Sequence, residues 1–319
     1  MTRNAFEFLR RYIHFCDNSK RIPAGDAGYD ILFKVRYPLN LILKGIRKAW
    51  VPGKHIAVDE SMIKYMGRAV SFVQYMPAKP IKHGVKVYAI CCGSSAILLG
   101  YKIYCGVEVG FSNHALDICD LLIREAALGY YRGRVLYTDN WYTSVKLAIH
   151  LFQTFGWTMV GTISPTDKKS REDLDVPFLK LSNGARDSVK RGWLREAVVK
   201  VILPHAKVLY IQCTSWKDSK QVMFVSTNRV GCSSGIVVKR HVKGQKLRNE
   251  LDGCMAQQDY IQYFNAVDRN DRDSADYSTT IRTNRYYLRI FCWALDRAVR
   301  RYIHHLHSQR ALGSMQDVE

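Results

Sequence analysis

The sequence predicts a mixed α/β fold, and this prediction rests on two patterns and on the size of the chain. Residues 55–107 are rich in short apolar runs of strand length, and residues 115–163 alternate between helical and strand-like spacing. Hydrophobic residues make up 47% of the 319 residues, which is enough for a packed core. At roughly 100–200 residues per domain, the chain has room for two domains or for one large domain with an insertion.

The N-terminal third is predicted to contain two helices followed by a group of strands. Apolar residues at helical spacing predict a helix over 5–15, which ends at the turn-forming Asp17-Asn18-Ser19. A second helical stretch over 39–50 stops before Pro52-Gly53. Strand-like runs follow at 55–58, 71–75, 85–92 and 97–107.

The rest of the chain separates into parts of different composition. Alternating patterns predict helix 115–127, strand 135–137, helix 144–155 and strand 158–163. A charged, turn-rich stretch over 164–190 precedes strand-like alternation over 193–227, which predicts an antiparallel inserted unit. Residues 236–250 are strongly basic, and residues 284–307 are predicted to form a helix with one broad apolar stripe.

The chain carries a large excess of positive charge, which indicates a polyanionic partner. Lys and Arg number 48 against 28 acidic residues, so the formal net charge is +20 and the sequence pI is near 9.6. No apolar run reaches the roughly 18 residues of a transmembrane helix, and no hydrophobic signal core follows Met1. These observations favour nucleic acid over a membrane surface as the partner. They also favour a reducing compartment. Nine scattered cysteines without a CxxC pair are typical of buried thiols rather than of a zinc site.

Widely spaced aspartates are candidates for a metal-binding catalytic site. Asp59 and Asp139 each follow a short apolar strand, and Asp268, with Asp271 three residues later, stands at a predicted helix start. Carboxylates held in this way can bind two Mg²⁺ or Mn²⁺ ions about 4 Å apart, the arrangement that serves phosphoryl transfer. An aspartate after a strand is also typical of a turn or a helix N-cap, and Asn140 after Asp139 fits that alternative.

The residues around these aspartates form several blocks in a fixed order. The blocks are RYIHFCDN at 11–18, HIAVDESM at 55–62, GR at 67–68, MPAKPIKHGVK at 76–86, TDNWYTS at 138–144, GT at 161–162, WKD at 216–218, KQV at 220–222, ST at 226–227 and YFNAVDRND at 263–271. Together they resemble the helical lead-in, the catalytic blocks and the insertion segment of the piggyBac transposase family. The resemblance spans about residues 3–307 and is more specific than any single aspartate.

The resemblance implies a cut-and-paste DNA transposase with an RNase H-like catalytic core. It implies that Asp59, Asp139 and Asp268 bind two Mg²⁺ or Mn²⁺ ions and that Asp271 is a further acidic residue of the catalytic site. Activated water would attack a phosphodiester at the transposon end, and the freed 3′-hydroxyl would attack the opposite strand and then a TTAA target. The implied partner is double-stranded DNA, the implied assembly is a homodimer, and the expected location is the nucleus.

The organisation of the family divides the sequence into segments. Helical dimerisation and DNA-binding segments are expected at 1–54 and 276–319, the catalytic core at 55–163 and 251–275, and the insertion domain at 164–250. Several basic side chains could hold DNA phosphates, with a solvated charged surface as the alternative for each. They are Lys79, Lys82, Lys86, Lys239, Arg240, Lys243, Lys246 and Arg248.

The sequence also departs from the family pattern. It begins at the equivalent of the helical lead-in and ends without the cysteine-rich zinc-binding tail, so a truncated member is expected. Asn265-Ala266 stands where the family has glycines before the third aspartate, and alanine adopts fewer backbone conformations than glycine. The alternative to an active transposase is a domesticated or inactive derivative that binds DNA without cutting it. A basic RNA-binding protein is disfavoured because the sequence contains no RNA-recognition signature.

Overall fold

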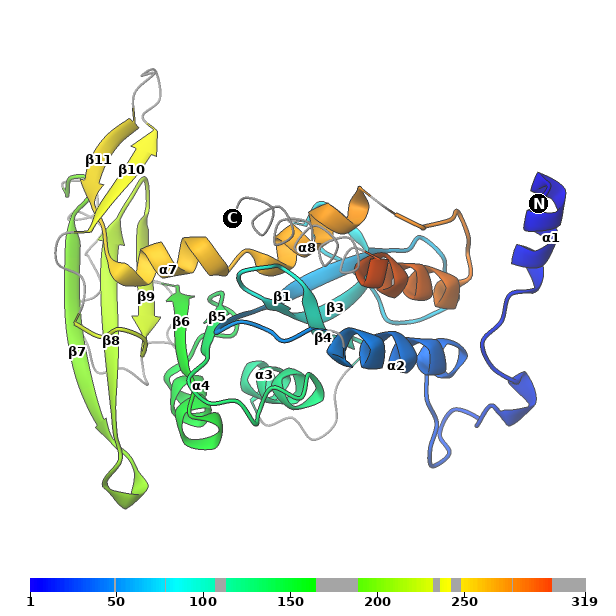
Figure 1. Cartoon of the computed structure of the whole chain (residues 1–319), viewed down its shortest axis with the longest axis horizontal. Helices are drawn as coiled ribbons and strands as arrows, with labels where there is room; N and C mark the ends of the chain where they lie inside the picture. The colour runs from blue at the N-terminus through cyan, green and yellow to red at the C-terminus, as the bar shows by residue number, and fades with distance from the viewer. Residues whose placement is uncertain are drawn as a thin grey trace, which may run out of the picture.

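The protein is built around one large sheet with helices on both of its faces (Figure 1). The computed structural model describes residues 1–48, 50–77, 79–106, 113–164, 189–231, 236–241, 248–276 and 278–299. The mixed α/β class predicted from the sequence is confirmed.

The sheet takes its strands from two stretches of the chain. The first stretch supplies β1 (His55–Lys64), β2 (Val73–Tyr75), β3 (His83–Cys92), β4 (Leu98–Ile103), β5 (Val135–Thr138) and β6 (Thr158–Ile163). The second supplies β7 (Leu194–Ile202), β8 (Val208–Lys217) and β9 (Gln221–Ser226). In space the order is β2-β3-β1-β5-β6-β9-β8-β7, and β4 also pairs with β3.

The centre of the sheet is parallel, whereas the strands on either side of it are antiparallel. β5 runs parallel to both β1 and β6, while β3 is antiparallel to β1 and β9 is antiparallel to β6. Parallel neighbours need a crossover connection, which usually contains a helix. Helix α3 (His114–Glu125) precedes β5, and helix α4 (Val145–His150), continued by a π-helical turn at Leu151–Phe155, precedes β6.

Strand β1 is longer than the predicted strand over 55–58. It continues past Asp59 because β3 pairs with it as far as Lys64, which lies opposite Gly84. Asp59 therefore lies inside a strand, and its predicted place at a strand end is wrong. The parallel partner β5 ends at Thr138, however, so Asp59 stands just beyond the parallel pairing.

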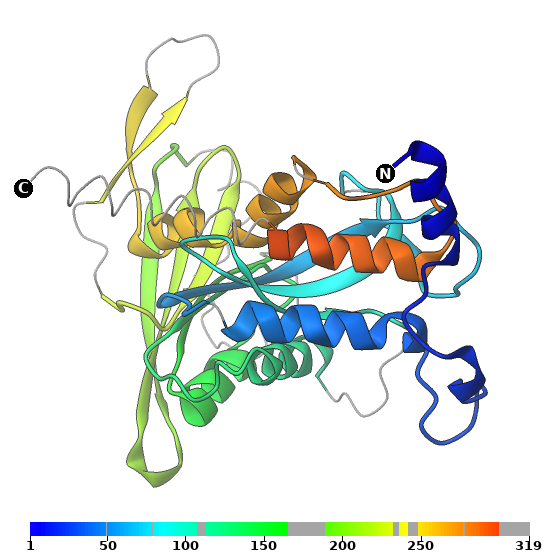
Figure 2. The same ribbon diagram turned by 45° about the vertical axis from the view of Figure 1, so that its right-hand side comes forward.

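Helices cover the two faces of the sheet around separate apolar clusters. On one face they are α2 (Phe33–Lys48), α7 (Met255–Tyr263), α8 (Ala266–Ala275) and a helix over 286–299; on the other they are α3 and α4. Ala57 belongs to the first cluster and Val58 to the second, because successive side chains of a strand point to opposite faces. Cys91 and Cys92 divide between the two clusters in the same way. Figure 2 shows α2 and the 286–299 helix running beside the sheet.

The inserted strands extend the central sheet instead of forming a separate one. The antiparallel strands predicted over 193–227 are present as β7, β8 and β9, and β9 pairs with β6. A two-stranded ribbon, β10 (Val237–His241) and β11 (Arg248–Asp252), projects from this end of the molecule (Figures 1 and 2). The predicted linker lies almost entirely at 165–188, outside the described residues.

The helices at the N-terminal end differ in part from the prediction. Helix α1 (Arg3–Tyr12) is shorter than predicted, and none of its side chains is buried. Helix α2 begins before Pro38 and includes it. Short 3₁₀ helices occur at Asn18–Lys20 and Pro204–Ala206. Within the described part of the chain, every helix is too short or too polar to span a membrane.

Candidate active site

The register of the parallel strands β1 and β5 brings Asp59 and Asp139 together. Val58 pairs with Thr138, so the next residue on each strand arrives at the same level of the sheet. Asp59 is 6% exposed, and Asp139 is half-buried. Aspartates that are far apart in the sequence therefore become neighbours through one pair of hydrogen-bonded strands.

Glu60 is a third member of this carboxylate group, and the sequence analysis did not assign it to the site. Oxygens from Asp59, Glu60 and Asp139 lie within 4.8 Å of one another. The Asp59 side chain bends toward the backbone of its own strand and accepts a hydrogen bond from the Glu60 backbone N–H at 2.7 Å. The Glu60 carboxylate accepts a hydrogen bond from the Tyr142 hydroxyl at 3.1 Å and pairs with the Lys86 ammonium at 3.3 Å.

Asp139 is held in place by the turn that leads into α4. Its Oδ1 accepts hydrogen bonds from the backbone N–H groups of Trp141 at 2.9 Å and Tyr142 at 3.4 Å. This is the pattern of an aspartate-stabilised turn, as the turn alternative expected. The N-cap of α4 is Ser144, however, and the Asp139 carboxylate still belongs to the carboxylate group.

Burial and crowding disfavour full ionisation of the carboxylate group. Burial raises the pKa of Asp59 to about 7, and the charges of Glu60 and Asp139 act in the same direction, whereas Lys79 opposes them. Burial also raises the pKa of Asp139, with a further contribution from Glu60. Both causes disfavour the charged form of an acid. The group therefore favours a nearby positive charge.

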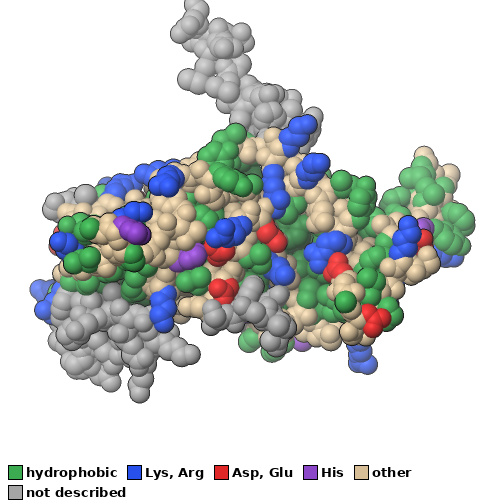
Figure 3. All heavy atoms as spheres, turned by 90° about the horizontal axis from the view of Figure 1, so that it is seen from below, with side chains coloured by type: hydrophobic (Ala, Val, Ile, Leu, Met, Phe, Trp, Pro, Cys, Tyr) green, Lys and Arg blue, Asp and Glu red, His purple; other side chains and the backbone are tan. Residues whose placement is uncertain are grey.

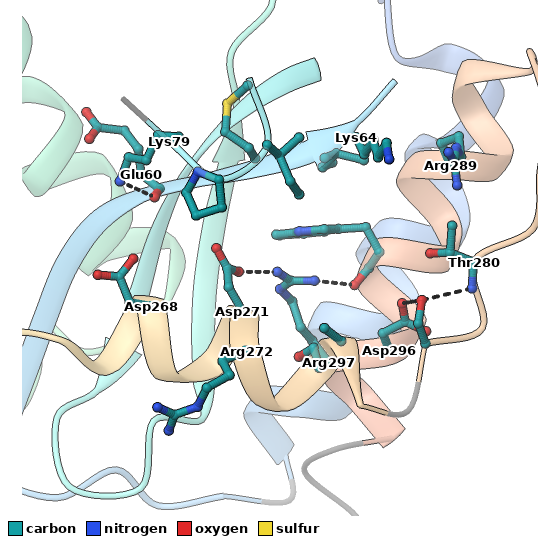
Figure 4. Close-up of a pocket in the computed structure, with 18 residues that line it drawn as sticks. Glu60, Lys64, Lys79, Asp268, Asp271, Arg272, Thr280, Arg289, Asp296 and Arg297 are labelled. Atoms are coloured by element: carbon teal, nitrogen blue, oxygen red, sulfur yellow. Dashed lines mark hydrogen bonds and ion pairs between the residues drawn. The ribbon is translucent and has the colours of Figure 1, made fainter. Parts of the chain in front are cut away.

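Asp268 and Asp271 come to the same region on α8, which packs against β1 and β3. Both line a cavity of about 880 Å³ together with Glu60 and Lys79 (Figure 4). Asp268 is exposed and, among the described residues, stands outside the close carboxylate group. The structure thus places Asp268 in the same cavity as Glu60 without adding it to the group.

The start of α8 accommodates the residues that replace the family's glycines. Asn265, at the N-cap, has φ −72° and ψ 18°, and Ala266 is the first helical residue and is buried. Neither residue adopts a positive φ. An alanine is therefore compatible with the backbone that precedes Asp268.

Asp271 is held by a buried arginine from the C-terminal helix. The Arg297 guanidinium forms an ion pair with Asp271, and the Ser61 hydroxyl donates a hydrogen bond to the same carboxylate at 2.8 Å. Arg297 is 5% exposed, donates to the Trp293 carbonyl at 2.9 Å and lies 3.8 Å from the centre of the Trp293 ring. These contacts tie the 286–299 helix to both β1 and α8.

The donor set of the carboxylate group fits a hard divalent cation. Asp59, Glu60 and Asp139 offer oxygen ligands alone, which is the ligand type that Mg²⁺ and Mn²⁺ prefer. A bound cation would also offset the repulsion and burial that raise the pKa of Asp59.

Comparison with known proteins identifies the family. Residues 1–300 match the family model described as Transposase IS4. The chain belongs to this transposase family. A solved structure described as the cryo-EM structure of the piggyBac transposase synaptic complex with hairpin DNA matches with a TM-score of 0.71 and 21% identity. That match covers 97% of this chain and 59% of the piggyBac chain.

The piggyBac match shows the fold of this transposase-family chain. With the family model, it confirms the resemblance seen in the sequence, and it confirms the predicted mixed α/β fold class, with which an RNase H-like core is consistent. The chain spans 59% of the length of the solved piggyBac chain. The Mos1 transposase paired-end complex with the left transposon end matches at 12% identity over 56% of this chain and 53% of that one, and its TM-score of 0.21 is too low to indicate a common fold.

The basic residues predicted to bind DNA lie in different surroundings. Lys79 and Lys86 border the carboxylate group, whereas Lys82 is exposed on the loop between β2 and β3. On the β10–β11 ribbon, Lys239 pairs with Glu250 and Arg240 pairs with Asp218. Lys243, Lys246 and the side chain of Arg248 lie outside the described residues.

Sequence reasoning missed two residues of the site, and their signals differ. Glu60 directly follows Asp59 in the block at 55–62, but a strand normally directs neighbouring side chains to opposite faces, so the sequence did not indicate that both belong to one group. Arg297 belongs to a helix rich in arginines, and its spacing does not distinguish a buried arginine from exposed ones. Its burial becomes evident from the packing of that helix against β1 and α8.

Proposed function

We propose that this chain is a metal-dependent DNA transposase of the piggyBac type, which cleaves and transfers DNA strands at transposon ends. The observation that carries the proposal is the group formed by Asp59, Glu60 and Asp139 beside a cavity that Asp268 also lines. Membership of a transposase family supports DNA strand transfer as the reaction class. Nuclear location and a homodimer are part of the same proposal.

The site residues would hold the divalent cations, and their surroundings would keep the carboxylates in position. Asp59 and Asp139, on neighbouring strands, would hold divalent cations, and Asp268 would complete the set from α8. When bound, two such cations would activate a water molecule and stabilise the departing oxygen of an in-line displacement. The carboxylates themselves are held by the sheet and by backbone hydrogen bonds, so little reorganisation is needed.

The proposed reaction consists of successive displacements at phosphorus. Water attacks a phosphodiester at the transposon end, the P–O3′ bond breaks, and a 3′-hydroxyl is released. That hydroxyl attacks a phosphodiester of the opposite strand, which joins the two strands at the transposon end and releases the flanking DNA with its own 3′-hydroxyl. A second water hydrolyses the new bond and restores the 3′-hydroxyl of the transposon end, which then attacks a TTAA target. Each step forms one P–O bond and breaks one, so no redox partner is required.

The charge distribution suits a DNA substrate. The chain has a net charge of +20, and Figure 3 shows Lys and Arg side chains around a small group of acidic side chains on one face. Exposed cations such as Lys82 would bind phosphates, while the acidic group receives the metal ions.

A cleavage assay with matched variants tests the proposal. The protein is incubated with Mg²⁺ or Mn²⁺ and DNA that carries TTAA-flanked transposon ends, alongside Asp139→Asn and Asp273→Asn. Asp273 lies on α8 and pairs with the exposed Arg272, so its substitution controls for loss of a charge outside the carboxylate group. We expect metal-dependent nicking by the parent and by Asp273→Asn, and a loss of at least about 100-fold in Asp139→Asn.

The same assay evaluates the alternative function. Binding of this DNA without nicking, equal in the parent and in Asp139→Asn, would contradict a catalytic role and would favour a transposase-derived DNA-binding protein. Nicking that is equal in the parent and in Asp139→Asn would instead indicate that the carboxylate group is not the active site.

A further inference from the structure

Lys79 places a positive charge against the carboxylate group. Its Nζ lies 3.7 Å from Asp59 Oδ1 and donates a hydrogen bond to the backbone oxygen of Glu60 at 3.1 Å. The side chain is 24% exposed, and it enters the cavity from the loop between β2 and β3 (Figure 4). A lysine of that loop thus lies where a cation bound by Asp59 would be expected.

The charges that face Lys79 come from two separate elements. Asp59 and Glu60 belong to β1, whereas Asp268 and Asp271 belong to α8. Glu60, Asp268 and Asp271 line the same cavity as Lys79, and Asp59 forms an ion pair with it. The ammonium is therefore a charged partner of the site.

Lys86 differs from Lys79 in its position. Its ammonium pairs with Glu60, and it lies 4.5 Å from the centre of the Tyr88 ring and 5.1 Å from that of Trp141. These contacts hold Lys86 beside Glu60, which is its acidic partner among the described residues. Among the described residues, Lys79 is the cation that forms an ion pair with Asp59.

The loop that carries Lys79 is held by backbone hydrogen bonds of its own. Hydrogen bonds from Met76 N to Lys82 O at 2.8 Å and from Lys79 N to Met76 O at 3.1 Å close the loop at its base. Pro80 further restricts its backbone. The flexible four-carbon stem of lysine can then swing while the loop stays in place.

We propose that Lys79 is a built-in counter-charge of Asp59 that a divalent cation displaces when it binds, so that Lys79 sets the metal affinity of the site. The inference rests on the proposed function because it assigns the metal to the same carboxylates. In the absence of metal, the ammonium offsets the repulsion among Asp59, Glu60 and Asp139. In the presence of metal, it competes with the cation for the Asp59 oxygen.

Metal binding and thermal unfolding test this role without measuring cleavage. Lys79→Met keeps most of the side chain, shortened by one atom, and removes its charge. Lys82→Met makes the same change at an exposed position in the same loop. With the full chain at constant pH 8, we expect Lys79→Met to bind Mn²⁺ about tenfold more tightly by titration calorimetry, with Lys82→Met unchanged within about twofold. In chelator, Lys79→Met should unfold several degrees below both the parent and Lys82→Met.

A double-mutant cycle separates the counter-charge from a structural role. In an Asp59→Asn background, Lys79→Met should cause much less further loss of thermal stability, because the carboxylate it balances is gone. An equal loss in both backgrounds would show that Lys79 acts through packing and would overturn the proposal. Unchanged or weaker Mn²⁺ binding by Lys79→Met would also overturn it. Because the chelator arm requires neither metal nor DNA, a protein that fails to cut DNA still returns an answer on Lys79.

Discussion

The ion pair between Arg297 and Asp271 provides the sharpest test of how the C-terminal helix supports the site. Replacing Arg297 by Met keeps most of the volume of the side chain and removes the guanidinium. Asp271 then loses its cationic partner but keeps the hydrogen bond from Ser61. The Trp293 carbonyl loses a donor at the same time.

The expected cost follows from the burial of the arginine. Removal of one partner from a buried ion pair typically costs about 3–5 kcal/mol, because a charge is left without compensation. Arg297 is 5% exposed, so the buried estimate applies to it, although Asp271 is partly exposed. At about 2 °C per kcal/mol for a chain of this size, the thermal midpoint should fall by about 6–10 °C.

Thermal unfolding of a set of variants tests the expected cost of removing Arg297 and its coupling to Asp271. Arg297→Met is compared with Asp271→Asn, with the double variant, and with Arg272→Met, whose exposed ion pair should contribute less than about 1 kcal/mol. The double variant should recover part of the loss and show a coupling of about 2 kcal/mol or more. A midpoint for Arg297→Met that equals that of Arg272→Met would refute the reasoning, as would strictly additive losses.

Two further predictions concern Asp59 and two glycines. Folded Asp59 keeps its proton up to about pH 7, whereas an ordinary aspartate loses it near 3.8, so the folded state binds more protons between these values. In the presence of a chelator, the free energy of unfolding should therefore fall by up to about 4 kcal/mol as the pH rises from 4 to 7. When this free energy is measured by urea unfolding at each pH, it should depend less on pH in Asp59→Asn than in the parent, and an equal pH dependence would contradict the prediction. A Cβ on Gly84 would lie 2.1 Å from the backbone oxygen of Ile63, so Gly84→Ala should cost more than about 3 kcal/mol. Gly45, in α2, has no neighbour within 4 Å of such a Cβ, so Gly45→Ala should raise stability by about 0.5–1 kcal/mol; equal thermal midpoints for the two variants would refute the packing argument.

The sequence predicted the central strands well because their signal is local. Apolar runs over 85–92 and 158–163 appear as β3 and β6 with small changes at the ends. The predicted end of β1 was wrong because polar Asp59, Glu60 and Ser61 interrupt the apolar run. The backbone pairing of β1 with β3 nevertheless continues through these three residues. Pairing with a neighbouring strand, which no local pattern reports, decides where such a strand ends.

The sequence likewise indicated which aspartates matter but not how they are grouped. Block order placed Asp59, Asp139 and Asp268 in one site, and the structure brings the first two together through the β1–β5 register. Asp268 instead lies on the cavity wall, and Glu60 joins the close group. The assignment of all these residues to catalysis stays a prediction.

By itself, the sequence determined the fold class, the succession of strands and helices over 55–163 and the strands over 193–227, and it resembled a transposase family, because periodicity and motif order are properties of the chain. It also determined the charge of +20, which indicates a polyanionic partner. Only the tertiary structure decided that Glu60 completes the carboxylate group, that Lys79 lies against Asp59, and that Arg297 is buried beside Asp271. These contacts join residues from distant parts of the chain or depend on how the Asp59 side chain bends toward the backbone of its own strand. Their distances and burial are set by packing, which the order of residues does not display.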